Sequence, residues 1–507
     1  MDIISALSLI AVIIPAVSYG WGMRGTTIGG EKGAMLPGAL IGAIIALTSG
    51  ILIVQEYFYV FAALGAIGMY FGGCMTYGET LGLSMNAKPA ENMKKGLIAL
   101  LVKGFLWFGS FGVILTTGIN AISGVYSILD LIIIFVITPA LSLICYHYLN
   151  HPLDIDQHIF PKIYFSKTRK EYWGALVGLM GALLIFSIIK LNGYVIVFSL
   201  ICGIFGGAGW VVAQLLQISI KHYSKNSKYS FIRKISSQSK IDSWKAMECA
   251  LGAIGAIGVA IAHIVTYDSF KNTVFSLEKS GGIIPRNNTL SVVCFIIWII
   301  LLVADMAHYF VKRPVTKSEL LKQLRQRKIT KEEYGIRAVN AVDIVPKFYD
   351  YYEKATEPIE FLLYAAIPFV LVCLGSINVA SILALFILFW VLIQEIAFEK
   401  NFSPKINLIL QIVFSGIGFC LFIFQIISGF KIDKNIVLIV YTAVYEVFSL
   451  GYLVPEIINK TKNKGNIMAN SSNKLMGYFK CFISNKGFII THIYFIICIV
   501  FTLIGLL

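Results

Sequence analysis

The sequence predicts an all-α, polytopic transmembrane helix bundle, and three observations support this. Of the 507 residues, 57% are hydrophobic and 14% are charged, whereas a soluble domain has roughly 25% charged residues. The hydrophobic residues form segments of about 20, enough for a helix to cross a hydrocarbon core of ~30 Å. Several segments, such as residues 131–144, are apolar on all sides and lack the alternation of an outer-membrane strand.

The predicted spans follow one another along the whole chain. In the first half they cover residues 3–18, 33–51, 57–73, 96–118, 129–149, 172–189, 195–218, 246–266 and 290–311. In the second half they cover residues 361–373, 379–396, 406–427, 436–455 and 489–507. The first segment has no basic region and no cleavage site, so we interpret it as a retained helix. Residues 33–51 either cross fully or form a re-entrant loop, which gives about 13–14 spans with Gly-rich broken or re-entrant segments.

The longest polar segment suggests a division of the chain into three parts. Residues 312–356 contain proline, glycine and charges of both signs. We therefore expect an N-terminal transmembrane bundle over residues 1–311, a cytoplasmic basic linker over residues 312–356, and a C-terminal transmembrane bundle over residues 357–507.

The basic residues predict the orientation of the bundle. They gather in loops at residues 88–95, 162–170, 221–240, 312–354 and 460–486, and an even number of predicted spans separates each loop from the next. Lys and Arg in short loops are retained in the cytoplasm. We expect these loops to be cytoplasmic and the protein to be a multi-pass protein of the cell membrane, most simply the bacterial cytoplasmic membrane.

Composition also limits the partners and cofactors. The formal charge of +15 does not indicate a nucleic-acid partner, because the basic residues lie mainly between membrane spans. The nine cysteines are scattered without a CxxC pair, which excludes a recognisable disulfide framework or zinc site. The expected partners are the lipid bilayer and a small-molecule solute, with no cofactor and no metal, and a homo-oligomer is left open.

A glycine-rich segment is the first candidate site. Residues 19–42 contain eight glycines and Pro37, which predicts a broken helix or a hairpin rather than one smooth helix. The candidate binding residues here are Trp21, Arg24, Glu31 and Lys32. Ionisable groups at membrane depth cost about 3 kcal/mol each, so they usually pair or line a pathway. The alternative is a short extracytoplasmic loop with ordinary charges.

Two further clusters lie at predicted helix ends. Residues 72–84 provide Tyr77 and Glu79 among small and hydroxyl-bearing residues. Residues 241–252 provide Trp244, Lys245 and Glu248, with the lysine and the carboxylate one helical turn apart. Either cluster contacts a solute, or each is an interfacial helix end with capping hydroxyls and an anchoring tryptophan. We expect Glu79 and Glu248 to join the charges of residues 19–42 in one polar cavity, since pairing lowers the cost of each buried charge.

Candidate coupling groups lie elsewhere. Asp305 and His308 are three residues apart, a spacing that lets them share a proton, and the alternative is a hydrogen-bonded pair at the interface. Glu446 lies inside a predicted span, where desolvation favours the neutral carboxyl, as proton-coupled carriers require.

Two functional classes remain after the motifs are considered. Glu332, Glu333 and Arg337 spell an EExxxR string that resembles the first motif of the CAAX-protease family. In that family, however, the string lies in a membrane helix and catalytic histidines follow it, whereas here it is hydrophilic and only His492 follows. No GxSxG or Walker sequence is present, and we identify no catalytic residue.

The sequence therefore favours a transporter, a secondary carrier or permease for a small polar solute. Arg24 and Lys32 would suit an anionic one, and protons or sodium ions are the candidate coupling ions. The alternative is a membrane-embedded enzyme acting on a lipid or lipid-linked substrate.

Overall fold

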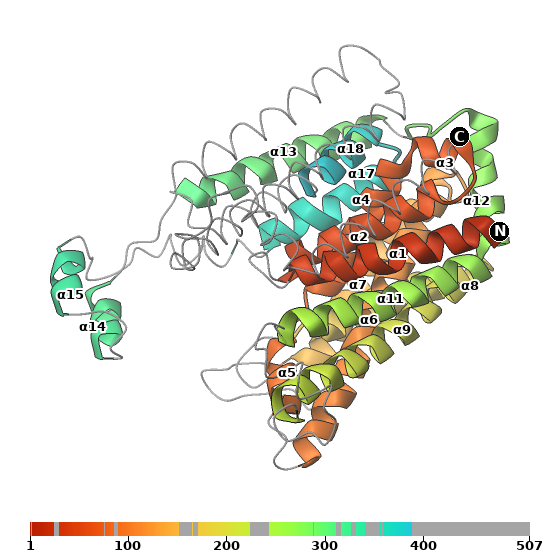
Figure 1. Ribbon diagram of the computed structural model, residues 1–507. Helices are drawn as coiled ribbons and strands as arrows, with labels where there is room; N and C mark the ends of the chain where they lie inside the picture. Colours follow the sequence, from red (N-terminus) through yellow and green to blue (C-terminus); the bar gives the residue numbers. More distant parts are fainter. Residues whose placement is uncertain are drawn as a thin grey trace, which may run out of the picture. The chain divides into compact units, whose positions relative to one another are not determined.

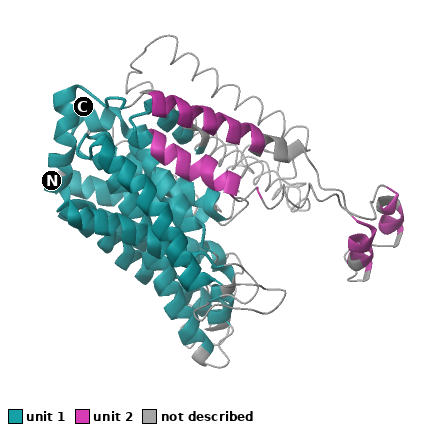
Figure 2. Cartoon of the chain, turned by 180° about the vertical axis from the view of Figure 1, so that it is seen from behind, with its two compact units in different colours: residues 1–286, 372–507 teal, residues 287–371 magenta. Residues whose placement is uncertain are grey.

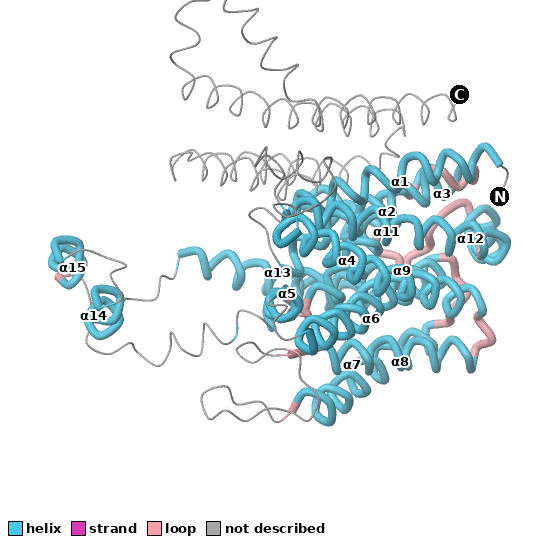
Figure 3. Tube along the Cα trace, turned by 60° about the horizontal axis from the view of Figure 1, so that its bottom comes forward, coloured by secondary structure: helices cyan, strands magenta, loops and turns pink. Residues whose placement is uncertain are grey.

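The computed structural model confirms the predicted fold class. It describes residues 1, 3–24, 30–75, 77–85, 90–151, 165, 171–223, 243–286, 288–310, 316–325, 331–339, 355 and 358–387. These residues are almost entirely helical, with short connecting loops and no strand (Figure 3). Six of their helices are long and apolar enough to cross a membrane, and four shorter apolar helices accompany them. The chain is therefore an all-α membrane helix bundle in a lipid bilayer. The spans predicted at residues 406–427, 436–455 and 489–507 lie outside the described residues.

The chain divides into two compact units (Figure 2). The first comprises residues 1–286 together with residues from 372 onward, and the second comprises residues 287–371. The predicted division into a bundle, a linker and a second bundle stays a prediction, and each unit is described by itself.

The first unit is a bundle of antiparallel helices (Figure 1). Its elements are α1 (Ile3–Arg24), α2 (Gly30–Leu47), α3 (Leu52–Glu56), α4 (Phe58–Gly73), α5 (Gly78–Met85), α6 (Ala90–Ile122), α7 (Ile128–Asn150), α8 (Trp173–Ile189), α9 (Gly193–Ile218), the π-helical turn η1 (Ser219–Tyr223), α11 (Ser243–Val265), α12 (Tyr267–Ser280) and α18 (Ile377–Phe386). Helix α6 contacts α4, α5, α8 and α9, while α1 packs against α2 and α11. The core of the unit thus forms around α6, which at 33 residues is its longest helix.

The glycine-rich segment is divided between two helices that pack against each other, so it is not one smooth helix, as the sequence predicted. Helix α1 continues through Trp21 to Arg24, and α2 is one helix of 18 residues that passes through Pro37. At a rise of 1.5 Å per residue, α2 is about 27 Å long. This length suits a helix that crosses the membrane rather than a re-entrant loop. Between Arg24 and Gly30 lie residues outside the description. The glycines Gly38 and Gly42 within α2 lie at close contacts with α4.

Glycines set the closest helix crossings. Gly38 of α2 faces the backbone of Gly65 in α4, and Gly42 faces the carbonyl of Phe61, so that a Cβ at either position would overlap the partner backbone. Gly104 of α6 and Gly206 of α9 meet in the same way. Small residues at such crossings let helices associate in lipid, where no hydrophobic force draws them together.

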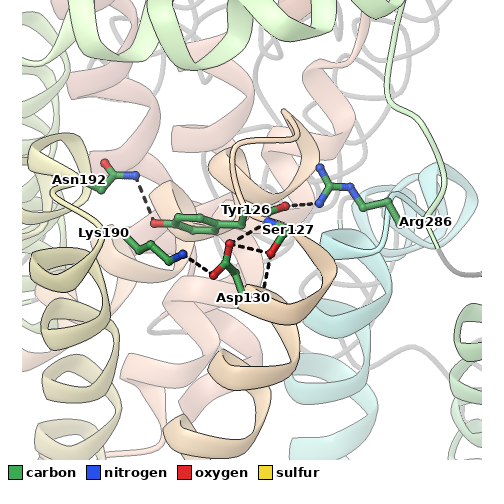
Figure 4. A network of polar contacts seen from close by, with 6 residues as sticks. All are labelled: Tyr126, Ser127, Asp130, Lys190, Asn192 and Arg286. Carbon is green, nitrogen blue, oxygen red and sulfur yellow. Dashed lines mark hydrogen bonds and ion pairs between the residues drawn. The ribbon is translucent and has the colours of Figure 1, made fainter.

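Polar contacts fasten one end of this bundle (Figure 4). The amide of Asn192 donates to the Tyr126 hydroxyl at 3.2 Å and also to the Asn120 side chain at 2.8 Å. Lys190 pairs with Asp130 at 2.6 Å, and the guanidinium of Arg286 donates to the Tyr126 carbonyl. These bonds join the loop between α6 and α7, the loop between α8 and α9, and the segment after α12.

Further bonds at the same end extend this set. Tyr267 donates to the carbonyl of Ser49 at 2.6 Å, and Ser276 donates to that of Ser123. Asp130 and Ser127 form a reciprocal capping box at the start of α7. We call this end, including the bonds of Figure 4, the fastened end.

The second unit contains a long helix and several short ones. They are α13 (Asn288–Phe310), α14 (Lys317–Arg325), α15 (Lys331–Ala338), the π-helical turn η2 (Leu362–Ala366) and most of α17 (Ile367–Cys373). The indole of Trp298 donates to the carbonyl of Leu363 at 2.8 Å, which holds α13 against η2. Thr316 and Glu319 cap α14 reciprocally at 3.0 and 3.1 Å. The expected basic linker therefore includes two short helices.

Candidate functional site

Five aromatic side chains meet inside the first unit. They are Trp21 of α1, Trp107 and Phe108 of α6, Trp210 of α9, and Tyr77, which immediately precedes α5; we call them the aromatic cluster. The ring centroids of Tyr77 and Trp210 are 4.9 Å apart, and those of Trp21 and Trp107 are 5.1 Å apart. All three tryptophans are fully buried. Edge-to-face and tilted pairs at these distances add about 0.5–1.5 kcal/mol each beyond the area that they bury.

Glycines on the surrounding helices make room for these rings. The Trp107 ring lies against Gly72 at the end of α4, and the indole nitrogen donates to the carbonyl of Met69 at 3.1 Å. Gly252 and Gly255 of α11 face Trp21 and Phe108. A side chain at either glycine would overlap an aromatic ring, so the cluster depends on glycine at these positions.

A buried ion pair lies one helical turn from the cluster. Lys103 precedes Trp107 by four residues on α6, so the two share a face. Its ammonium nitrogen is 3.2 Å from a carboxylate oxygen of Glu171 and 3.0 Å from the Thr80 hydroxyl. Both charged side chains are only 1% exposed. Charges this well buried are costly unless paired and hydrogen-bonded, which is the arrangement found here.

Helix α9 adds an amide side chain to these buried polar groups. Gln214 follows Trp210 by four residues, and its amide nitrogen donates to Ser84 Oγ at 2.7 Å and to the Leu81 carbonyl at 3.3 Å. Helix α5 therefore supplies a partner to Lys103 through Thr80 and a partner to Gln214 through Ser84. We call Lys103, Glu171, Thr80, Ser84 and Gln214 the polar layer. It lies at the end of the unit opposite the fastened end.

The α11 candidates border the same region. Lys245 donates to the carbonyl of Gly22 at 2.8 Å, and Ser18 donates to that of Cys249 at 2.9 Å, so α1 and α11 are joined beside the cluster. Glu248 is 2% exposed. It precedes Gly252 by four residues and Gly255 by seven, which places it on the face of α11 that contacts the aromatic cluster.

The other candidate residues have different positions. Glu31 lies at the start of α2, where its backbone packs against Gly73, and Lys32 follows it, half-buried. Trp244 is 38% exposed at the start of α11. The structure thus places Trp21 and Tyr77 in the aromatic cluster, and Glu248 on the face of α11 that borders this cluster.

Several predicted site residues have side chains outside the described part of the chain. Arg24 ends α1, Glu79 is in α5, and Asp305 and His308 are in α13 of the second unit, but their side chains lie outside the described part, and so does Glu446. Convergence of the five charges on one cavity stays a prediction. Of the described residues, no three or more His, Cys, Asp or Glu side chains are grouped to hold a metal ion.

Sequence reasoning missed the polar layer. Lys103 is the one charged residue between positions 96 and 122, inside a predicted span, and an intramembrane charge is by default a functional candidate. That signal was present in the sequence. Glu171 and Gln214 carried none, because their role depends on which helices are neighbours.

Comparison of the chain with protein-family models, curated proteins and solved structures finds no match. The site offers hydrogen-bonding groups, aromatic faces and a pair of opposite charges inside a membrane bundle.

Proposed function

We propose that this protein is a multi-pass transporter, a secondary carrier or permease for a small polar solute, with the aromatic cluster and the polar layer as its solute pathway. The main support is the ion pair of Lys103 and Glu171, whose side chains are each 1% exposed within a bundle of apolar helices. A buried pair is often no more stabilising than apolar residues of the same volume. A functional role accounts for charges at this depth better than stability does.

The surroundings of the pair support a pathway. Lys103, Gln214 and Glu248 come from three helices, each long and apolar enough to span a membrane. All three lie toward the end of the unit at which α6 and α11 begin and α9 ends. In the sequence, the basic loops predicted at residues 88–95 and 221–240 adjoin these helix ends. In a cell membrane that end would face the cytoplasm, and a solute leaving the pathway there would pass the polar layer.

The proposal also includes the charge of the solute, the coupling ion and the membrane. An anionic solute would be favoured by Arg24 and Lys32, and coupling to protons or sodium ions would use Asp305, His308 or Glu446. The bacterial cytoplasmic membrane is the proposed location. The competing class is an enzyme acting on a lipid-linked substrate, for which the polar layer would provide a carboxylate in Glu171 and a hydroxyl in Thr80, 3.0 Å from the Lys103 nitrogen.

Transport into vesicles tests the proposal. The full-length protein is reconstituted into phosphatidylethanolamine and phosphatidylglycerol liposomes and given radiolabelled succinate, glycine, choline or sorbitol, one solute of each charge class. We expect uptake of at least one above that of protein-free liposomes. The variant Lys103→Met should abolish this uptake, because it removes the buried ammonium group that contacts Glu171 and Thr80.

A matched control uses a second ion pair, which is partly exposed. Lys190 contacts Asp130 at 2.6 Å but is 42% exposed at the fastened end, so Lys190→Met should retain uptake. If all four solutes enter no faster than in protein-free liposomes, the transporter proposal is refuted. Conversion of the vesicle lipids by the wild-type protein would instead favour the enzyme.

A further inference from the structure

Three side chains along α9 carry polar atoms that are buried without a hydrogen-bond partner. They are Trp210 Nε1, Gln214 Oε1, and both amide atoms of Gln217. All three residues are fully buried. Leaving such an atom unsatisfied costs about 1–3 kcal/mol, so native proteins retain few of them. Four on one helix indicate a site that a ligand completes.

The spacing places these atoms on one side of the helix. Gln214 and Gln217 follow Trp210 by four and seven residues, which are positions on one helical face. That face meets the aromatic cluster through Trp210 and α5 through Gln214. The unpartnered atoms therefore extend from the cluster through the polar layer, along the proposed pathway.

The kinds of atom identify the kind of ligand. An indole nitrogen only donates, the Gln214 oxygen only accepts, and the Gln217 amide does both. A carboxylate group offers only acceptors and an ammonium group only donors, so neither group alone would satisfy all of these atoms. A hydroxyl group both donates and accepts. Several hydroxyls on one uncharged molecule would satisfy the whole set.

The surroundings agree with an uncharged ligand. Lys103 and Glu171 neutralise each other at 3.2 Å. The faces of Tyr77, Trp107 and Trp210 provide apolar surface of the type that lines ligand sites around a few hydrogen-bonding groups. Tyr77 lies just outside α5 and is half-buried.

We propose that the α9 stripe Trp210, Gln214 and Gln217 binds a neutral polyhydroxylated solute, a polyol or sugar, with its C–H faces against the aromatic cluster. The physiological role of this binding site rests on the proposed transport function, but binding can be measured without transport. The α9 stripe favours a neutral solute, whereas Arg24 and Lys32 would favour an anionic one, and the measurements below distinguish the two.

Direct binding tests this assignment. Purified full-length protein in detergent is titrated with tritiated sorbitol, glucose or myo-inositol, and unlabelled succinate and choline serve as competitors. We expect saturable binding of at least one of the three, with no displacement by either ion. Gln217→Leu should weaken this binding about tenfold or more, the effect of losing hydrogen bonds worth roughly 1.4 kcal/mol.

The leucine variant should fold, because it replaces unsatisfied buried atoms by an apolar group of similar size. Its thermal unfolding midpoint should equal or exceed that of the wild type. The control is Gln55→Leu, which removes an amide that donates to the Leu47 carbonyl at 3.0 Å, away from the site; it should leave binding unchanged.

The outcomes separate this inference from the transport proposal. No saturable binding of any of the three polyols, or binding that Gln217→Leu leaves unchanged, overturns the inference, and buried water then satisfies these atoms. Uptake of succinate by vesicles with no polyol binding keeps the transporter and rejects the neutral solute. Polyol binding that Gln217→Leu weakens, without uptake by vesicles, supports the site and rejects the transporter.

Discussion

Removing the buried ion pair one partner at a time and then together should give strongly non-additive effects. Lys103 and Glu171 are each 1% exposed and 3.2 Å apart. Lys103→Met leaves a buried carboxylate, and Glu171→Leu leaves a buried ammonium, so each should lower the free energy of unfolding by about 3–5 kcal/mol. The double variant removes both charges, and its stability should return to within about 1 kcal/mol of the wild type or exceed it.

The assay is unfolding of the full-length protein in mixed micelles by added sodium dodecyl sulfate, followed by the change in helical circular dichroism. The Thr80 hydroxyl, which accepts from Lys103 at 3.0 Å, loses a donor in two of the variants, a cost of about 1 kcal/mol that the cycle includes. Lys190→Met removes a pair whose lysine is 42% exposed, and it should cost no more than about 1 kcal/mol.

One result would refute the burial argument. If the two single variants each cost under about 1 kcal/mol and their effects add in the double variant, then water reaches Lys103 and Glu171 and screens them. The functional interpretation of the pair would then lose its basis, since exposed charges at a helix end need no special role.

Three further predictions concern packing, pH and orientation. Gly65→Ala should lower the unfolding midpoint, because the added Cβ would overlap the backbone of α2 and cause a strain of about 1–3 kcal/mol. Gly181→Ala is the control and should leave the midpoint unchanged, because no atom lies within 4 Å of the added Cβ. Burial raises the pKa of Tyr126 to about 12, above its unfolded value, so its stabilising contribution is present below about pH 10 and is lost as pH rises through 12. The unfolding midpoint should therefore fall less steeply over this range in Tyr126→Phe, and equal slopes would contradict the assignment. Reporter fusions at Ser236 and Ser280 should report the cytoplasm and the outside respectively, and the same side for both would overturn the charge argument.

The helices were predictable because each membrane span satisfies its own backbone hydrogen bonds. Length and hydropathy alone then identify α4, α7 or α8 to within a few residues. The extent of α1 and α2 was less evident. The glycines of residues 19–42 indicated a break, and the segment is indeed divided between α1 and α2, but Gly38 and Gly42 serve a close crossing with α4. Sequence alone does not separate these two uses of glycine.

The site could be predicted only in part, since it is built by contacts between distant segments. Trp21 and Tyr77 stood out among small residues, and Glu248 as a charge in an apolar helix. The partner of Lys103 lies 68 residues away, and Gln214 reaches Ser84 over 130 residues. Which helices pack together depends on backbone approach at small residues, and hydropathy does not encode it.

The fastened end has a mechanical consequence for the bundle. There, side chains bond to backbone and to each other across loops that join consecutive helices, as between Asn192 and Tyr126 or Arg286 and Tyr126. The opposite end holds the unpartnered atoms of α9. If α6 and α9 separate, we expect them to pivot about the fastened end, because fewer bonds must break when the helices part at the polar layer. A cross-link near Asn192 would then leave the protein active, whereas one joining α5 to α9 beside Gln214 would lock it.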